Sequence, residues 1–327
     1  MARTEWGNQT AITEFVLLGF GYLQELQIFL FLLFLIIYIG TMAGNILIVV
    51  LVVADQHLHT PMYFFLGNLS CLEICYSSTI LPRMLASLLT EDKSISFLGC
   101  VMQYYFFGCL VATECYLLGV MSYDRYLAIC KPLHYVTLMN GKRSRQIAAG
   151  SWICGLLTNT IITSLMSQLL FCGPNEIDHF FCDLTPVLNL SCSDAHLVEL
   201  VTFILASIGT MPLFLLTLMS YVYIISTILR IPSTTGRQKA FSTCSSHLIV
   251  VTVFYGTLII VYIVPETNAL REVHKVLSLF YTVLTPMINP LIYSLRNKEV
   301  RKALHNAVNK FIVFRETQAK SSCFRLL

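Results

Sequence analysis

The chain has 327 residues, of which 56% are hydrophobic and only 12% are charged, and its formal net charge is +3. Soluble globular domains carry about 25% charged residues, so this composition excludes an ordinary soluble globule and a disordered chain. The same figures exclude a nucleic-acid-binding domain.

Residues 1–25 are polar and are expected to form an extracellular N-terminal tail. They lack the charged start and the short apolar core of a cleavable signal peptide, so the first apolar segment is expected to act as the insertion signal. Asn8 begins an Asn-Gln-Thr sequon in this tail and is expected to carry a glycan. Asn189 begins a second sequon, but the nearby Cys192 could block its use.

Seven long apolar segments follow the tail. Each is long enough to span a bilayer core, which takes about 20 residues, and backbone groups in lipid must bond internally, so each segment is predicted to be a helix. The segments are 26–54, 60–88, 97–130, 141–166, 199–229, 238–264 and 273–295. The predicted fold class is therefore an all-α membrane protein, a bundle of seven transmembrane helices.

The positions of Lys and Arg predict the orientation of this bundle. With the N-terminus outside, 16 of the 21 basic residues fall at the cytoplasmic ends, in the cytoplasmic loops or in the C-terminal tail. The outer side keeps Arg3, Arg83, Lys93, Arg271 and Lys275. The asymmetry favours an outer N-terminus and an inner C-terminus.

The twelve cysteines divide by side of the membrane. Eight lie in or near the apolar segments or in the tail, where cysteine commonly acts as a small hydrophobic residue. Cys100, Cys172, Cys182 and Cys192 would face the oxidising side, and four cysteines allow three pairings. The loop of about 32 residues between the fourth and fifth segments holds three of them. At least one bridge must therefore lie within that loop if all four pair.

Four motifs now point to one family. They read PMYFFL at 61–66, MSYDRYLAIC at 121–130, KAFSTCSSHL at 239–248 and PMINPLIYSLRN at 286–297. Together, in this order and on these segments, they closely resemble the olfactory receptors, within the rhodopsin-like G-protein-coupled receptors. The resemblance covers the chain from about residue 8 to about residue 310.

The resemblance makes Arg125 the residue that couples the receptor to its partner. An unpaired Arg is costly in the apolar end of a bundle, and its neighbour Asp124 can neutralise it in the resting state. On activation Arg125 is expected to turn toward the bundle centre, with Tyr126 beside it. Arg237 and Lys239 are basic where many wider relatives have an acid that locks this Arg, so such a lock is not expected.

Other switch positions are also implied by the resemblance. Tyr221 and His247 are expected to cap Arg125. Pro290 permits a kink in the seventh segment because proline removes one backbone hydrogen bond, and with Tyr293 it resembles the family's switch segment. The sixth segment lacks the usual Cys-Trp-x-Pro toggle, and Tyr255 is the candidate for that role.

Glu73 and Glu114 are the two acidic residues deep in the predicted bundle. Two carboxylates close together in a low dielectric cannot both ionise freely. Either a sodium ion lies between them, or one carboxyl group holds a proton and shares it with water. Asn45 and Asn289 match polar positions around this site in the resembled family. A sodium ion is expected to stabilise the inactive state.

The resemblance also places a ligand pocket among the helices. Phe107 stands where receptors for charged amines carry an Asp, so an amine anchored in that way is not expected. The other positions are apolar with a few hydroxyls, which suits a small, neutral, volatile molecule held by dispersion and one hydrogen bond. Plain helix packing is the alternative for each residue. The predicted set is Phe107, Gly108, Val111, Ala112, Leu205, Ala206, Gly209, Tyr255, Leu258, Ile259, Tyr262, Ser278 and Thr282.

The family pattern further assigns the disulfides and the domain limits. Cys100 matches the family position that bridges to the middle of the second extracellular loop, which implies Cys100–Cys182 and leaves Cys172–Cys192. The receptor domain is expected at 26–295. Residues 296–327 are expected to form a cytoplasmic tail that starts with a short amphipathic eighth helix, its Lys298, Arg301 and Lys302 toward anionic lipid.

The function implied is that of an odorant receptor and not of an enzyme, and no nucleophile elbow, phosphate loop or zinc constellation is found. A small volatile ligand would shift the bundle toward an active state that engages a stimulatory heterotrimeric G protein of the olfactory type and raises cyclic AMP. The expected partners are the odorant, this G protein and membrane lipid, without nucleic acid. The expected location is the plasma membrane as a multi-pass protein, in sensory cilia if the receptor is olfactory.

Three alternatives remain at this stage. A retinal pump or sensor would need a lysine in the middle of the seventh segment, and Lys275 lies at its outer edge. A secondary transporter could use Glu73 and Glu114, but internal repeats are absent. A receptor of the same fold could instead bind a non-volatile metabolite outside the nose.

Overall fold

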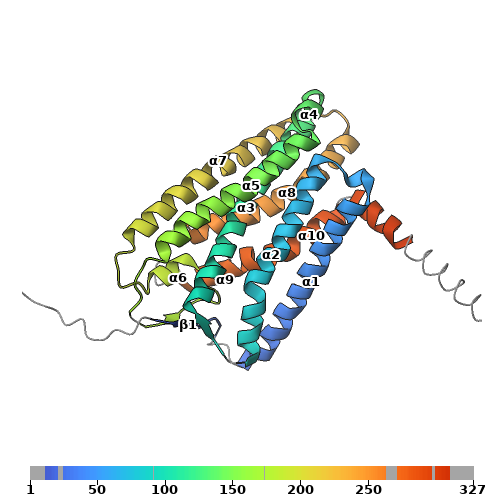
Figure 1. The fold of residues 1–327 in the computed structure, drawn as a ribbon. Coiled ribbons are helices and arrows are strands. Elements are labelled where there is room, and N and C mark those ends of the chain that lie inside the picture. The colour runs from blue at the N-terminus through green and yellow to red at the C-terminus, as the bar shows by residue number, and fades with distance from the viewer. Residues whose placement is uncertain are drawn as a thin grey trace, which may run out of the picture.

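The computed structural model describes residues 12–20, 25–90, 92–172, 174–262, 271–296 and 299–309 as a bundle of long helices (Figure 1). Within the helices, the side chains at 239, 242–243, 246, 271–272 and 293–296 are not described. A small sheet and one described short helix cover one end of the bundle, which we call the lid end. The opposite end, near the short helix α4 (Pro132–Leu138), is called the Arg125 end.

The long helices match the seven predicted segments. They are α1 (Gln27–Ala54), α2 (Pro61–Thr90), α3 (Phe97–Cys130), α5 (Gly141–Met166), α7 (His196–Leu229) and α8 (Thr234–Tyr262). The last span consists of α9 (Arg271–Leu279), the π-helical turn η3 (Phe280–Leu284) and α10 (Thr285–Arg296). The largest differences from the prediction are earlier starts of α7 and α8.

Short elements join these helices. At the Arg125 end, η2 (Gln56–Leu58) links α1 to α2, and α4 (Pro132–Leu138) links α3 to α5. Side chains mark several helix starts, because an N-terminal turn leaves backbone N–H groups without partners. Ser96 accepts a hydrogen bond from the Gly99 amide before α3, and Asn140 accepts one from the Arg143 amide before α5. Pro132 begins α4.

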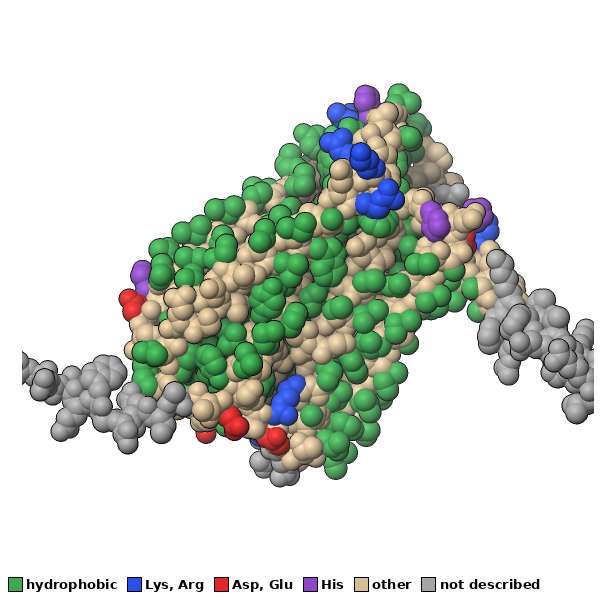
Figure 2. Space-filling view, viewed as in Figure 1, with side chains coloured by type: hydrophobic (Ala, Val, Ile, Leu, Met, Phe, Trp, Pro, Cys, Tyr) green, Lys and Arg blue, Asp and Glu red, His purple; other side chains and the backbone are tan. Residues whose placement is uncertain are grey.

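The surface of the bundle suits a membrane. Within the described chain, α1, α2, α3, α5, α7 and the span Val273–Ile292 are long and apolar enough to cross one, and α8 adds a shorter apolar stretch, His247–Tyr262. Hydrophobic side chains cover the flank of the molecule, and Lys and Arg gather at the Arg125 end (Figure 2). Of the apolar stretch in α3, 61% is buried, against 6% in α7. Helix α3 is therefore the inner helix of the bundle, and α7 faces outward.

The lid end is built from three separate parts of the chain. Strand β1 (Glu14–Leu17) lies between β2 (Ser94–Ser96), which is antiparallel to it, and β3 (Glu176–Ile177), which is parallel to it. Phe15 is fully buried and contacts the rings of Phe97 and Phe171. We call residues 167–195, with β3 and α6 (Leu184–Leu188), the lid. The N-terminal strand thus holds the lid to the start of α3.

Two disulfides anchor the lid. Cys100 at the start of α3 is bonded to Cys182, and Cys172 is bonded to Cys192 within the lid. This is the pairing that the family pattern implied. Asn189, in the second sequon, is exposed at the end of α6, three residues before the bridged Cys192. Asn8 lies outside the described residues.

The segment 299–309 is helical and amphipathic. Val300 and Ala303 are buried against the bundle, while Arg301 and Lys302 are exposed. This is the pattern expected of a short helix that lies along a membrane surface. Lys298 lies outside the described residues.

Candidate functional site

A cavity of about 740 Å³ lies beneath the lid, between α3, α5, α7, α8 and α9. This volume is within the range of pockets that hold small organic ligands, about 300–1,000 Å³. Eleven of the thirteen predicted pocket residues line it. They are Phe107, Gly108, Val111, Ala112, Leu205, Ala206, Gly209, Leu258, Ile259, Tyr262 and Ser278.

Tyr255 and Thr282 are not among the described residues that line this cavity. The Tyr255 ring packs against Phe214, and its hydroxyl donates to the carbonyl oxygen of Cys115 on α3 at 2.9 Å. The Thr282 hydroxyl donates to the carbonyl oxygen of Ser278 at 2.5 Å. Both hydroxyls are therefore used by the backbone. Tyr255 lies one turn from Leu258, which does line the cavity.

Asn159 on α5 reaches the cavity wall because Gly108 on α3 has no side chain. A Cβ at position 108 would overlap the side-chain oxygen of Asn159. The Asn159 amide nitrogen donates to the carbonyl oxygen of Gly155 at 3.1 Å. Sequence reasoning missed Asn159, although a lone amide within an apolar segment was a signal for it.

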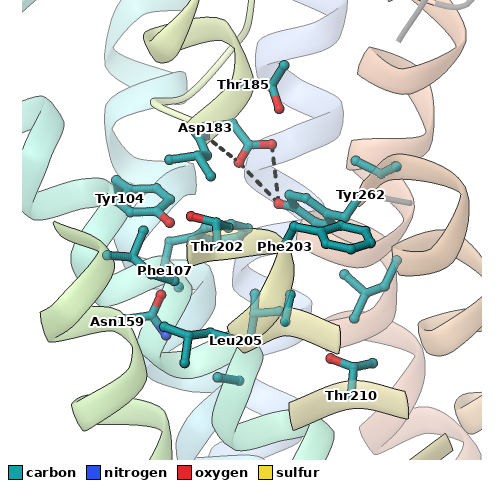
Figure 3. Close-up of a pocket in the computed structure, with 18 of the residues that line it drawn as sticks. Tyr104, Phe107, Asn159, Asp183, Thr185, Thr202, Phe203, Leu205, Thr210 and Tyr262 are labelled. Atoms are coloured by element: carbon teal, nitrogen blue, oxygen red, sulfur yellow. Dashed lines mark hydrogen bonds between the residues drawn. The ribbon is translucent and has the colours of Figure 1, made fainter. Parts of the chain in front are cut away.

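The lid supplies polar walls that the sequence did not reveal. Asp183, buried and directly after the bridged Cys182, accepts the Tyr262 hydroxyl at 3.1 Å (Figure 3). The Tyr262 hydroxyl is 3.2 Å from that of Tyr281, which donates to the Ser278 hydroxyl at 3.3 Å. A chain of hydroxyls thus joins the lid to α8 and the last span.

An ion pair ties the lid to α9. Lys275, only 2% exposed, has its Nζ 2.5 Å from the Asp178 carboxylate, and both residues line the cavity. Lys275 lies near the lid-end start of the last span, where the prediction placed it, and is buried in the cavity wall. Next to Asp178, burial lowers the pKa of His179 to about 3, and the positive charge of Lys275 acts in the same direction. His179 is therefore neutral near pH 7.

The two deep carboxyl groups meet below the cavity. Glu73 and Glu114 are fully buried and interact with each other, and the Asn289 amide donates to Glu73. Asn45 has other contacts: its amide nitrogen donates to the carbonyl oxygens of Thr41 at 3.0 Å and Pro286 at 3.1 Å.

Several oxygens around these carboxyl groups have no hydrogen-bond partner in the described chain. They are Glu73 Oε2, both carboxyl oxygens of Glu114, Asn289 Oδ1, Ser77 Oγ and the Tyr76 hydroxyl. Buried polar atoms without partners mark a proton, a water or an ion. Oxygen ligands alone suit a hard cation, so the residues fit either of the two occupants expected.

The Arg125 end differs in part from expectation. The Asp124 carboxylate accepts the Tyr135 hydroxyl at 3.0 Å, and burial together with the Asp124 charge raises the pKa of Tyr135. No ion pair between Asp124 and Arg125 is found in the described chain, and Nη2 of Arg125 is buried there without a partner.

Tyr221 and His247, expected to cap this arginine, bond each other: the Tyr221 hydroxyl lies 2.5 Å from His247 Nδ1. His247 still lies close enough to Arg125 to feel its charge. Pro290 packs so closely on α1 that a Cβ at Gly44 would lie 3.1 Å from its ring. The Tyr293 side chain lies outside the described residues.

The sequence comparisons with known proteins agree on one family. The sequence profile described as "Olfactory receptor" matches residues 34–310. The human protein named Olfactory receptor 6N1 is 50% identical over 304 residues, 93% of this chain and 97% of that protein. The mouse protein named Olfactory receptor 5AP2 is 48% identical over 306 residues, 94% and 96% of the two chains. Squid rhodopsin has the same fold, with a TM-score of 0.67 at 16% identity over 88% and 87% of the two chains.

Proposed function

The chain belongs to the olfactory receptor family, and from this premise we propose that a small, mostly apolar, volatile ligand bound beneath the lid switches it on. Members of this family are multi-pass G-protein-coupled receptors and not enzymes. The observation that carries the proposal is the cavity of about 740 Å³, whose walls come from four long helices, the short helix α9 and the lid. A ligand touching so many elements is able to favour one helix arrangement over another, which is what a population shift requires.

The output of this switch is a stimulatory heterotrimeric G protein of the olfactory type, which raises cyclic AMP. Arg125 supports the assignment, because its Nη2 is buried without a partner in the described chain and would gain one if the helices part and a protein enters from that end. The basic residues Lys142, Arg143 and Arg145 at the start of α5 are exposed at the same end, where they favour a cytoplasmic orientation. Asp124, Tyr126, Tyr221, His247, Pro290 and Tyr293 form the rest of the proposed switch.

The buried carboxyl groups give the switch an internal ion or proton. Glu73, Glu114 and Asn289 would hold a sodium ion through oxygen atoms, with Asn45 supporting the last span next to them. The alternative occupant is a proton shared with water. In either case Glu73 and Glu114 cannot both be charged and unpaired. Because Asn289 on the last span donates to Glu73, a rearrangement of these carboxyl groups is linked to movement of that span.

In the cell, we place the receptor in the plasma membrane of sensory cilia with the lid end outside. The exposed basic residues at the Arg125 end and the disulfides at the lid end support this orientation. Residues 1–25 would then be extracellular, with a glycan on Asn8. Residues 26–295 would form the receptor domain, and 296–327 would lie in the cytoplasm.

The test is cyclic AMP in cells that express the intact chain, against a panel of volatile organic compounds. Wild-type receptor is expected to respond in a dose-dependent way, and Arg125→Ala is expected to lose the response at equal surface staining. Arg143→Ala, which removes an exposed arginine at the same end, is the matched control and should respond as the wild type does. Silence of the surface-expressed wild type toward the whole panel would remove the volatile-ligand proposal. An intact response in Arg125→Ala would remove the coupling role.

A further inference from the structure

The cavity is polar near the lid and mostly apolar farther inside. Tyr104 and Thr202 lie within two turns of the lid-end starts of their helices, and Asp183 and Tyr262 lie beside them (Figure 3). Deeper lining residues on the same helices are mainly apolar, among them Val111, Ala112, Leu205, Ala206 and Leu258, and the polar exceptions there are Tyr116, Ser207 and Thr210. A ligand that fills both parts must itself be polar at one end and apolar at the other.

Two polar side chains in the outer part have atoms that the protein leaves without partners. His274 on α9 is 8% exposed and lines the cavity, and its Nε2 has no hydrogen-bond partner in the described chain. Thr202 on α7 lines the same cavity, and its hydroxyl is likewise buried and without a partner there. Such atoms are costly. Both are enclosed in this arrangement, so a ligand bonds them when their side chains turn toward the cavity.

The charges around this part of the cavity act against a negatively charged ligand. Among the described lining residues, Asp178, Asp183 and Glu199 carry carboxylates and Lys275 carries the ammonium. The Lys275 ammonium already lies 2.5 Å from the Asp178 carboxylate. A ligand carboxylate would therefore meet an excess of negative charge in a poorly hydrated space.

We propose that the outer part of the cavity binds the hydroxyl group of a neutral aliphatic alcohol, with His274 and Thr202 as the residues that determine specificity. The inference rests on the proposed function and names its ligand class. A hydroxyl both donates and accepts, so it satisfies the imidazole nitrogen in either tautomer and the threonine hydroxyl as well. An alkane of the same length leaves both atoms unpaired, and a site with buried polar atoms rejects such an analogue.

The experiment uses the full chain and straight-chain compounds of six to ten carbons: primary alcohols, alkanes, carboxylic acids and primary amines. Cyclic AMP dose–response curves are recorded for the wild type, His274→Leu and Thr202→Val at equal surface staining. The matched controls are His196→Leu and Thr160→Val, which change exposed residues outside the cavity. In parallel, the thermal midpoint of purified receptor is measured with and without 1-octanol, which reports binding without coupling.

The alcohols are expected to be the most potent class on the wild type. Each cavity variant should raise the half-maximal alcohol concentration about three- to tenfold, the worth of one hydrogen bond, and should change the alkane response less. His274→Gln keeps a donor and an acceptor and should recover part of the loss. The two control variants should match the wild type.

Other outcomes separate this inference from the proposed function. The inference is overturned if acids, amines or alkanes are more potent than alcohols on the wild type. It is also overturned if the alcohol response is unchanged in both cavity variants. In both cases the odorant-receptor function stands. If 1-octanol raises the thermal midpoint in a way that His274→Leu reduces, but no cyclic AMP appears, the ligand class stands and the proposed coupling fails. If the wild type shows neither a cyclic AMP response nor a shift of the thermal midpoint with 1-octanol, the inference is overturned.

Discussion

At the scale of single residues, two glycines of one helix have opposite surroundings. A Cβ at Gly155 on α5 would lie 2.7 Å from the carbonyl oxygen of Cys109 and would also overlap the Thr113 side chain, both on α3. A Cβ at Gly150, also on α5, would have nothing within 4 Å. The first glycine allows α5 and α3 to pack closely, whereas the second has no such role.

Gly155→Ala is therefore expected to lower the free energy of unfolding by about 1–3 kcal/mol, because a backbone carbonyl cannot move aside cheaply. Gly150→Ala should leave it unchanged or raise it by about 0.5–1 kcal/mol, since alanine favours helix more than glycine does. Thermal unfolding of the purified receptor measures both. Equal midpoints for the two variants would contradict the packing argument.

His179 makes the stability of the lid depend on pH. Its pKa is about 3 in the folded receptor, because of burial and the nearby Lys275, against an ordinary value of 6.5. Between these values the unfolded chain binds a proton that the folded chain does not. Stability is therefore complete above pH 6.5 and falls as the pH drops toward 3, by up to about 1.4 kcal/mol per pH unit.

The check is a series of thermal unfolding curves between pH 7.5 and pH 5 for the wild type and His179→Gln. Glutamine does not protonate, so the variant should lose less stability than the wild type over this range. A control change at the exposed His196 should keep the wild-type slope. Parallel curves for the wild type and His179→Gln would show that another group causes the dependence.

At the scale of elements, the join between α1 and α10 depends on one amide side chain. Pro290 has no N–H, so the carbonyl oxygen of Pro286 one turn earlier loses its helical partner. Asn45 on α1 supplies a donor instead, with its amide nitrogen 3.1 Å from that oxygen. Gly44 allows the close approach, because a Cβ there would lie 3.1 Å from the Pro290 ring. The proline-containing end of the last span is therefore held by α1.

Asn45→Leu is expected to cost about 1–3 kcal/mol of stability, because it leaves the Pro286 carbonyl oxygen buried without a donor. Adding Pro290→Ala restores a backbone N–H for that oxygen and should recover a large part of the loss. The comparison of both single variants and the double variant by thermal unfolding gives the coupling energy. If the stability losses of the two single variants simply add in the double variant, Asn45 and Pro290 do not act through the same Pro286 carbonyl oxygen.

At the scale of the whole molecule, the apolar flank separates two unlike ends. The lid end carries the sheet and both disulfides, and the Arg125 end carries exposed basic residues (Figures 1 and 2). Disulfides form on the oxidising side of a membrane, and basic loops stay in the cytoplasm. Both physical rules give the same orientation for the bundle.

An epitope tag at the N-terminus should therefore stain on intact cells, and a tag at the C-terminus should stain only after permeabilisation. Reversing the charge of Lys142, Arg143 and Arg145 should increase the fraction of chains in the wrong orientation. Staining of the C-terminal tag on intact cells expressing the wild type would contradict the orientation.

The amino-acid sequence alone determined the seven spans, because membrane-spanning helices need long apolar runs whatever surrounds them. Four contiguous motifs were also enough to identify the family. The pocket positions came from the family resemblance, and eleven of the thirteen line one cavity because residues on one face of a helix stay together. From Ser278, the same periodicity one turn toward the lid would have reached His274.

Only the tertiary structure decided which other groups meet. The lid has no periodicity, so nothing in the sequence indicated that Asp178 and Asp183 would line the cavity, or that Lys275 would be buried against one of them. The directions of the hydroxyl groups could not be predicted from the sequence either. The Tyr255 hydroxyl donates to a backbone oxygen of α3, and the Thr282 hydroxyl donates to a backbone oxygen of its own span. Spans follow from local composition, whereas a binding site follows from contacts between residues far apart in the chain.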